Sequence, residues 1–445
     1  MKLNTTFATM LSIAAILPST AMAEGVSEES VAALLERLSK MEKEVLALRG
    51  QLDSAQSEKE VEIEVVEEED ELDVNWKGAP EIKGGNGWSV KPRGRFLYDA
   101  AHLSSVPESI NIPGEGFSNE VRRARFGIQG TMPGGFGYKF EVDYAGGSAL
   151  TDAYLSYKDG SMKIIVGQHN NFQGLAELTS SNDYSFIERA AFTDAFGFER
   201  RLGLSATYKV DELQFQGGIF TDNVDDLDDG NDSYSLDGRV TYAPKYDGAQ
   251  LHFGTSIHSR ELGDEMDSVR YRQRPLVHSV DTRFVNTGNI SGTTSEFSYG
   301  LEAAIVKDRF HAIAETHWVN VERTNMADPT FFGSSIEAGY FLTNDQRQYK
   351  DGVLKGAKVS SPVGNGGIGA WQVNFKYDHL DLVDSGIVGG TQDAYIASLI
   401  WTPVNNVRFL VNYGHISYSD TLDIVGGAPS DFSVNVFGAR AQVSF

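Results

Sequence analysis

The sequence predicts an all-β transmembrane barrel of about 16 antiparallel strands, preceded by a periplasmic α-helical coiled-coil segment. Three observations support this fold class: apolar and polar residues alternate after residue 88, short and long connections alternate between those segments, and the last segment stops at Phe445. We expect four parts, namely a signal peptide (1–23), a coiled-coil helix (24–57), an acidic linker (58–87) and the barrel (88–445).

The N-terminus has the composition of a secretory signal. Lys2 precedes an apolar stretch over residues 7–17, and the small residues Ala21 and Ala23 suit a cleavage site. We therefore expect the mature chain to begin near Glu24; a structural N-terminal helix is the alternative. The chain has no cysteine, so we expect an exported protein held together without disulfide bonds.

The segment after the predicted cleavage site carries apolar residues at alternating spacings of three and four, which are the a and d positions of a heptad repeat. Three heptads are short for independent stability because helix nucleation is costly. The seam therefore predicts self-association, helped by a body that already oligomerises. A single amphipathic helix lying on another surface is the alternative. The seam consists of Val31, Leu34, Leu38, Met41, Val45, Leu48 and Leu52.

The acidity of the chain, with a formal net charge of −24, is unevenly distributed. Ten of the 16 residues from Glu58 to Asp73 are acidic. Such a block repels itself and favours an extended linker. Phosphate neutralisation needs a basic surface, so we expect no nucleic acid among the partners.

The alternation after residue 88 favours membrane strands over a soluble β-sandwich, which is the alternative. The segments are about nine to eleven residues long, as a tilted membrane strand requires, and aromatic residues recur near their ends. Phe445, on the last strand, resembles the assembly signal of bacterial outer-membrane barrels. In residues 138–144 the two faces separate into Tyr138, Phe140, Val142 and Tyr144 against Lys139, Glu141 and Asp143.

Strand parity places the segment SVRYRQRP (268–275) in a connection. Strands alternate in direction, so short turns must follow every second strand, and a separate spanning strand here would break that order. We therefore assign it to a long outer connection between Ser259 and Glu296. Arg270, Arg272 and Arg274 occupy every second position of it, which spaces them ~7 Å apart along one face of an extended chain.

Segments spread over residues 88–445 resemble the phosphate-selective porin O/P family of Gram-negative outer membranes. They include NEVRRARFGIQGTM, GQHNNFQGLAELTSSNDYSFIER, EAGYFLTNDQRQY and GARAQVSF. The resemblance implies a trimeric porin with 16 strands, a pore constricted by the third outer loop, and a lumen that receives the fifth loop and a long periplasmic connection. It also implies an arginine ladder for phosphate or other small anions, outer-membrane lipid and lipopolysaccharide as surroundings, and a periplasmic N-terminal segment.

The resemblance and the alternation together give a set of anion-path residues. Guanidinium binds oxyanions through a planar fork and stays charged, and a row of weak sites lets an anion both enter and leave. Binding of lipopolysaccharide phosphates, or pairing with acidic residues across the pore, is the alternative role. The expected residues are Arg270, Arg272, Arg274, Arg123, Arg125, Arg95, Arg93, Arg239, Arg189, Lys350, Lys355 and Lys358.

Other functions stay open at this point. The lumen face also carries acidic residues, so a non-specific or mixed-selectivity porin is one alternative, and an envelope tether acting through the coiled coil is another. We find neither a nucleophile elbow nor a paired-histidine motif and expect no enzyme, cofactor or metal centre. The acidic segment Asp222–Asp232 lacks the order of an EF-hand, although a loose divalent-cation site there is open. The preferred anion, the regulation by phosphate and the role of the coiled coil in setting the trimer are also open.

Overall fold

The computed structural model describes residues 28–59, 72–76, 78–108, 110, 115–228, 230–421 and 430–445. The predicted signal peptide and most of the acidic block lie outside these residues. The chain divides into two units, Met1–Glu69 and Asp70–Phe445.

The first unit contains one described helix, α1 (Glu28–Lys59), which includes all seven predicted seam positions. Leu38, Met41, Val45 and Leu48 are each more than half exposed in the single chain. The coiled coil itself stays a prediction, because a seam needs a partner helix. Among the described residues, no helix has both the length and the apolar character to cross a bilayer.

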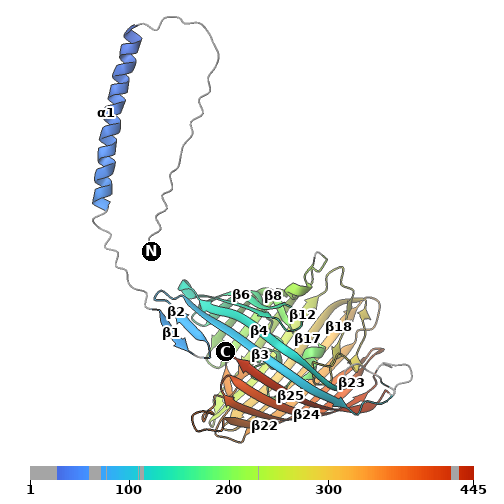
Figure 1. Cartoon of the computed structure of the whole chain (residues 1–445). Helices are drawn as coiled ribbons and strands as arrows, with labels where there is room; N and C mark the ends of the chain where they lie inside the picture. Colours follow the sequence, from blue (N-terminus) through green and yellow to red (C-terminus); the bar gives the residue numbers. More distant parts are fainter. Residues whose placement is uncertain are drawn as a thin grey trace. The chain divides into compact units, whose positions relative to one another are not determined.

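The second unit is a closed antiparallel barrel of 16 strands (Figure 1), which confirms the predicted fold class and strand number. The last strand pairs with the first and closes the sheet. In chain order the barrel strands are β3 (Ser89–Ser104), β4 (Gly116–Thr131), β5 (Phe136–Asp143), β6 (Ala149–Asp159), β7 (Met162–Asn170), β8 (Arg200–Val210), β9 (Leu213–Thr221), β10 (Tyr234–Tyr242), β12 (Ala249–Glu261), β17 (Thr293–Lys307), β18 (Phe310–Arg323), β19 (Thr330–Phe341), β22 (Ala370–Asp384), β23 (Ile387–Val404), β24 (Val407–Ser419) and β25 (Phe432–Ser444).

Three short strands extend the barrel sheet: β1 (Asp73–Trp76), β2 (Pro80–Lys83) and β11 (Lys245–Tyr246). β1 pairs with β2, and β2 pairs with the beginning of β3. The hairpin of β1 and β2 lies in the stretch that the sequence assigned to the linker. Strands of four residues are too short to give a readable alternation, so the pattern contained no signal for them.

The connections between the strands lie at two ends of the barrel. Six short connections, predicted as turns, join strands at one end, which we call the turn end; the opposite end is the loop end. The third loop (171–199), the fourth loop (222–233) and the fifth loop (262–292) belong to the loop end, and one long turn (342–369) belongs to the turn end. SVRYRQRP lies within the fifth loop, as parity predicted.

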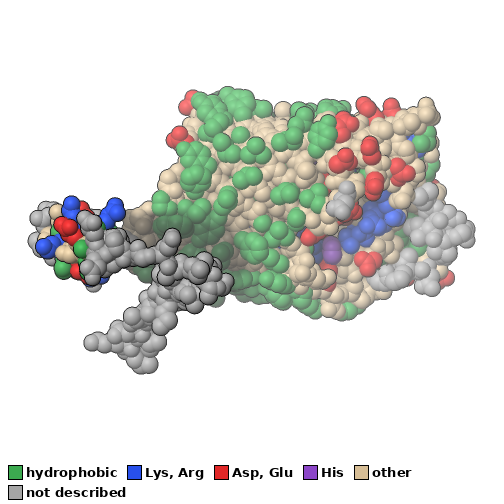
Figure 2. All heavy atoms as spheres, turned by 90° about the horizontal axis from the view of Figure 1, so that it is seen from above, with side chains coloured by type: hydrophobic (Ala, Val, Ile, Leu, Met, Phe, Trp, Pro, Cys, Tyr) green, Lys and Arg blue, Asp and Glu red, His purple; other side chains and the backbone are tan. Residues whose placement is uncertain are grey.

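The wall of the barrel alternates as predicted. Phe140 and Phe375 are about half exposed on the outside, whereas Glu141 and Lys376, their neighbours in sequence, are buried. Figure 2 shows hydrophobic side chains spread over the outer wall, with acidic and basic side chains gathered toward one end. This distribution suits a barrel with a lipid-facing exterior and a polar interior.

Loops fill part of the lumen. Residues of the third and fifth loops, including Phe192 and Phe284, form one apolar core with inward-facing residues of the wall such as Leu380, Ile396 and Ile416. The lumen beside β22–β25 is therefore closed by packing. Short elements within the connections are η1 (Pro133–Gly135), α2 (Leu175–Leu178), α3 (Ala191–Ala195), η2 (Val224–Asp226), β13 (Ser268–Val269), β14 (Arg272–Gln273), β15 (Val285–Asn286), β16 (Ile290–Ser291), β20 (Gln348–Lys350) and β21 (Val353–Lys355).

Candidate functional site: two lumen cavities of opposite charge

The inward faces of β3–β9, the third loop and the long turn enclose a cavity of about 780 Å³, which we call the basic cavity. Only three of its lining side chains are acidic, namely Asp152, Glu177 and Asp351. Eleven are basic, and five of the predicted arginines are among them: Arg93, Arg95, Arg123, Arg125, Arg189, Arg200, Lys139, Lys158, Lys163, Lys209 and Lys355.

One buried carboxylate holds three of these arginines in place. Glu141 of β5 contacts Arg93 at 3.0 Å, Arg95 at 3.6 Å and Arg125 at 3.4 Å. Arg125 also donates a hydrogen bond of 2.8 Å to Asp143. The guanidinium groups are thus fixed, and their positive charge exceeds that of the carboxylates between them.

Other basic residues of the cavity differ in how far they are neutralised. Asp152 accepts a hydrogen bond of 2.8 Å from Lys139 and lies 3.4 Å from Arg200. The side chains of Arg123 and Lys355, by contrast, form no hydrogen bond or ion pair with any residue that the structure describes. These two side chains leave positive charge available to a solute.

A β-bulge in β4 turns a further arginine into the lumen. Leu97 pairs with Arg123 and the next residue of β3 pairs with Val121, so Arg122 is the extra residue. Its guanidinium binds Glu188 of the third loop at 2.8 and 3.1 Å. Strict alternation would have placed Arg122 on the lipid face, so the sequence analysis missed it. Two consecutive arginines in a membrane strand are the signal that could have indicated a bulge.

Glu188 joins the third loop to β4 and β25, the two strands that flank β3 where the barrel closes. Arg440 of β25 donates to it at 3.2 Å, while also binding Asp99 of β3 at 2.6 and 2.7 Å. Burial by itself would raise the pKa of the Glu188 carboxyl, but Arg122 and Arg440 outweigh burial and hold that pKa below its ordinary value. The third loop is thereby fixed across the lumen.

Arg189 of the third loop lies where two cavities meet. Its guanidinium donates to the carbonyl oxygens of Ala176 and Glu177, each at 3.0 Å, and contacts the Glu177 carboxylate at 3.0 Å. Arg189 and Glu177 line both the basic cavity and a smaller cavity of about 80 Å³ between the third and fifth loops. The smaller cavity therefore adjoins the basic one.

The arginine row of the fifth loop faces away from the apolar core. Tyr271 and Gln273 are buried, whereas Arg270 and Arg272 are exposed and Arg274 is partly buried. Arg274 lines the smaller cavity, together with Arg122 and Arg189. At the other end of the row, Arg270 donates a hydrogen bond of 2.9 Å to Asn286.

Arg283 is a further arginine near the row that the sequence analysis did not select. It donates to the carbonyl oxygen of Asp281 at 2.6 Å. Burial, followed by the positive charges of Arg274 and Arg272, lowers the pKa of Arg283 to about 10. The fifth loop folds back on itself and brings Arg283 close to Arg274 and Arg272. No spacing of residues in the sequence indicates this fold.

Besides the arginine row of the fifth loop, three predicted residues do not line the basic cavity. Arg239 is fully buried; it donates to Glu302 at 2.9 Å and to the carbonyl oxygen of Gly352 at 2.9 Å, and so holds the long turn inside the barrel. Lys350 and Lys358 are exposed on the long turn and lie outside the lining. Of the three predicted lysines, only Lys355 lines the cavity.

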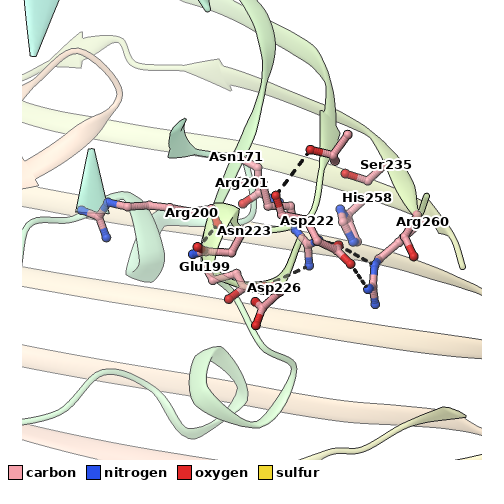
Figure 3. Close-up of polar contacts among 12 residues, drawn as sticks. Asn171, Glu199, Arg200, Arg201, Asp222, Asn223, Asp226, Ser235, His258 and Arg260 are labelled. Carbon is pink, nitrogen blue, oxygen red and sulfur yellow. Dashed lines mark hydrogen bonds and ion pairs between the residues drawn. The ribbon is translucent and has the colours of Figure 1, made fainter. Parts of the chain in front are cut away.

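A second cavity, of about 690 Å³, lies among the third, fourth and fifth loops, and we call it the acidic pocket. Figure 3 shows its floor, where Asp222 lies between Arg201 and Arg260. Arg200, although next to Arg201 in sequence, points away from this cluster. The lining includes three arginines, Arg270 among them, and seven acidic residues, namely Glu199, Asp222, Asp225, Asp226, Asp228, Glu265 and Glu296. Among the described residues, no three histidine or acidic side chains are arranged to hold a metal ion.

Comparison with known proteins identifies the family. The family model described as "Phosphate-selective porin O and P" matches residues 90–445. The chain belongs to this family. It is 44% identical over 384 residues to an uncharacterized protein of Caulobacter vibrioides, covering 84% of this chain and 77% of that one. It is 25% identical over 303 residues to Porin O of Pseudomonas aeruginosa, covering 61% of this chain and 68% of that one.

Solved structures show the same fold at low sequence identity. The anion-selective porin from Comamonas acidovorans superposes with a TM-score of 0.52 at 11% identity, over 80% of this chain and 100% of that one. The outer-membrane channel DcaP of Acinetobacter baumannii gives 0.51 at 13% identity, over 82% and 99%. Family and fold together establish this porin as an outer-membrane channel and not an enzyme.

Proposed function

We propose that this porin conducts small anions, inorganic phosphate among them. The observation that carries the proposal is the basic cavity, where eleven basic side chains face three acidic ones in a chain whose formal net charge is −24. A lumen lined by one sign of charge raises the local concentration of the opposite ion. The family description supports the same substrate class.

The path begins at the arginine row of the fifth loop. An anion would pass from Arg272 to Arg274, enter the smaller cavity beside Arg189, and continue into the basic cavity. Each site is water-exposed or shared with a carboxylate, so no single site binds too tightly for release. Lys355 provides an unpaired charge at the side of the cavity formed by the long turn.

Single-channel recording in a potassium chloride gradient tests this proposal. We expect an anion-selective reversal potential and a chloride current that added phosphate reduces. Arg123→Ala should weaken both effects, because it removes an unpaired charge from the cavity. Lys245→Ala is the matched control, since that lysine is exposed in β11 and lies outside the cavity lining. A reversal potential near zero that phosphate does not change would indicate a non-specific porin instead.

We also infer that the porin is a homotrimer, with the α1 seams of three copies meeting in the periplasm. The exposed apolar row of α1 supports self-association, because such a row is stabilised by burial against a like row. Removing residues 24–73 tests this inference by cross-linking and mass measurement. If the tail is an envelope tether instead, the truncated porin keeps its trimer and conductance while cells lose envelope integrity.

A further inference from the structure

The acidic pocket has the size and walls of a site for an organic molecule. Its volume of about 690 Å³ falls within the range of small-molecule sites. Its wall includes two aromatic rings, Phe196 and Tyr271, whose centroids lie 5.8 Å apart at an angle of 88°. Aromatic faces beside carboxylates attract organic cations through the electrostatics of the ring.

The charge of the pocket is compensated at its floor and uncompensated elsewhere. Asp222 and Glu296 are both bound by Arg260, at 2.5 and 2.7 Å. Four other carboxylates of the lining form no ion pair with any residue in the described part of the chain; they are Asp225, Asp226, Asp228 and Glu265. The third, fourth and fifth loops thus surround a space where seven acidic residues face three arginines, and Arg270 is the one lining arginine without an ion pair among the described residues.

The carboxylates are crowded enough to oppose one another's ionisation. Burial, and then the negative charges of Asp226 and Asp222, raise the pKa of Glu199 to about 7 despite Arg201 nearby. Burial and the charges of Asp222 and Asp225 likewise raise the pKa of Asp226. A bound cation would relieve this repulsion.

A buried polar side chain of the pocket is also without a partner. Gln173 of the third loop lines the pocket and is only 4% exposed. Its side-chain oxygen accepts no hydrogen bond from any described residue. An unpaired buried acceptor is costly, and an ammonium group, which only donates, would satisfy it.

We propose that the acidic pocket binds an extended organic polycation, such as a linear polyamine, at the loop end of the channel. The carboxylates come from three separate loops, an arrangement that suits several amino groups joined by a flexible chain. The occupant would link the third, fourth and fifth loops. This inference does not depend on anion conduction through the basic cavity.

Titration calorimetry of the purified full-length porin with spermidine tests the proposal. We expect saturable binding that weakens at least tenfold in Asp226→Asn/Asp228→Asn. Asp232→Asn is the matched control, because this exposed residue belongs to the same loop but does not line the pocket; it should bind within twofold of the unchanged porin. Gln173→Leu, which leaves the charge intact, should weaken binding by a smaller factor.

Two outcomes would overturn the proposal. One is equal spermidine affinity in the pocket variant and in Asp232→Asn, because binding would then reflect overall charge. The other is displacement of spermidine by an equal concentration of magnesium ions, because the pocket would then not distinguish a polyamine from a metal ion. The reversal potential of each variant shows separately whether the basic cavity is intact.

Discussion

The basic cavity and the acidic pocket are similar in size, about 780 and 690 Å³, but opposite in charge. They also share the third loop as a wall. Neighbouring residues of that region serve different cavities: Phe172 lines the basic cavity and Gln173 the acidic pocket, and Arg200 and Arg201 separate in the same way. The sign of the charge in each cavity therefore follows from how the third loop distributes its side chains between them. The net charge of the chain predicts the charge of neither cavity.

Reversing charge in the two cavities should produce the largest contrast. Arg123→Glu/Lys355→Glu should abolish or invert anion selectivity, because both charges line the basic cavity and lack protein partners. The same size of charge change in the acidic pocket, Asp226→Lys/Asp228→Lys, should leave the reversal potential nearly unchanged. Measurement in a salt gradient checks both variants. Equal shifts from the two pairs would mean that selectivity comes from overall charge.

Loss of the third-loop anchor should affect stability. Glu188→Ala removes the carboxylate between Arg122 and Arg440 and should lower the free energy of unfolding by about 3 kcal/mol, as is typical when one partner of a buried ion pair is removed. Urea unfolding of the lipid-reconstituted barrel measures this change. Glu199→Ala is the comparison, because the one ion pair that Glu199 forms among the described residues is 3.5 Å long and partly exposed. A similar loss in both variants would contradict the anchoring role of Glu188.

The acidic pocket should change its charge between pH 5 and pH 8. The Glu199 pKa of about 7 lies above its ordinary value of 4.5, so the contribution of Glu199 to stability is complete below 4.5 and is lost as the pH rises through 7. Asp226, Asp222, Arg201 and Arg260 are the charged groups acting on it. Glu199→Gln should show a smaller fall in the urea midpoint between these pH values. An unchanged pH dependence would refute the assignment.

The smallest effect on phosphate block should come from Arg274 and Arg283 of the fifth loop, of which only Arg274 lines a cavity of the proposed path. Arg274→Ala should weaken the phosphate effect by about twofold, the scale of a partly exposed ion pair, because Arg274 lines the smaller cavity. Arg283→Ala should change it less, since Arg283 lines neither the smaller nor the basic cavity. Titration of phosphate against single-channel current ranks the two. A larger effect from Arg283→Ala than from Arg274→Ala would place the anion path beside Arg283, in the later part of the fifth loop.

The features that the sequence predicted are local. Alternation with a period of two placed Arg93 and Arg95 on one inward face, and strand parity placed SVRYRQRP in the fifth loop. Both arguments need only neighbouring residues and the rule that strands alternate in direction. The family resemblance added the inward folding of the loops and the long turn.

The features that the sequence did not predict depend on contacts between distant segments. Arg239 follows the inward alternation, but the long turn covers it; Lys350 and Lys358 lie on that turn and remain outside the lining. Arg201, in β8, contacts Asp222 of the fourth loop, and Arg283 comes close to the arginine row through the path of the fifth loop. The apolar core inside the lumen was also not predicted, because its members come from the third loop, the fifth loop and several wall strands, and no local pattern in the sequence links them.

The β-bulge in β4 has a consequence for how such pores diversify. The residues on its two sides keep a regular alternation, but the two alternations are out of phase by one position. If Arg122 stayed in the strand without a bulge, it would face the lipid, and Val121 and Phe117 would turn toward the lumen while Arg123 and Arg125 stayed where they are. A bulge therefore lets a strand gain one residue, and with it one inward-facing charge, without reversing the other side chains of that half of the strand.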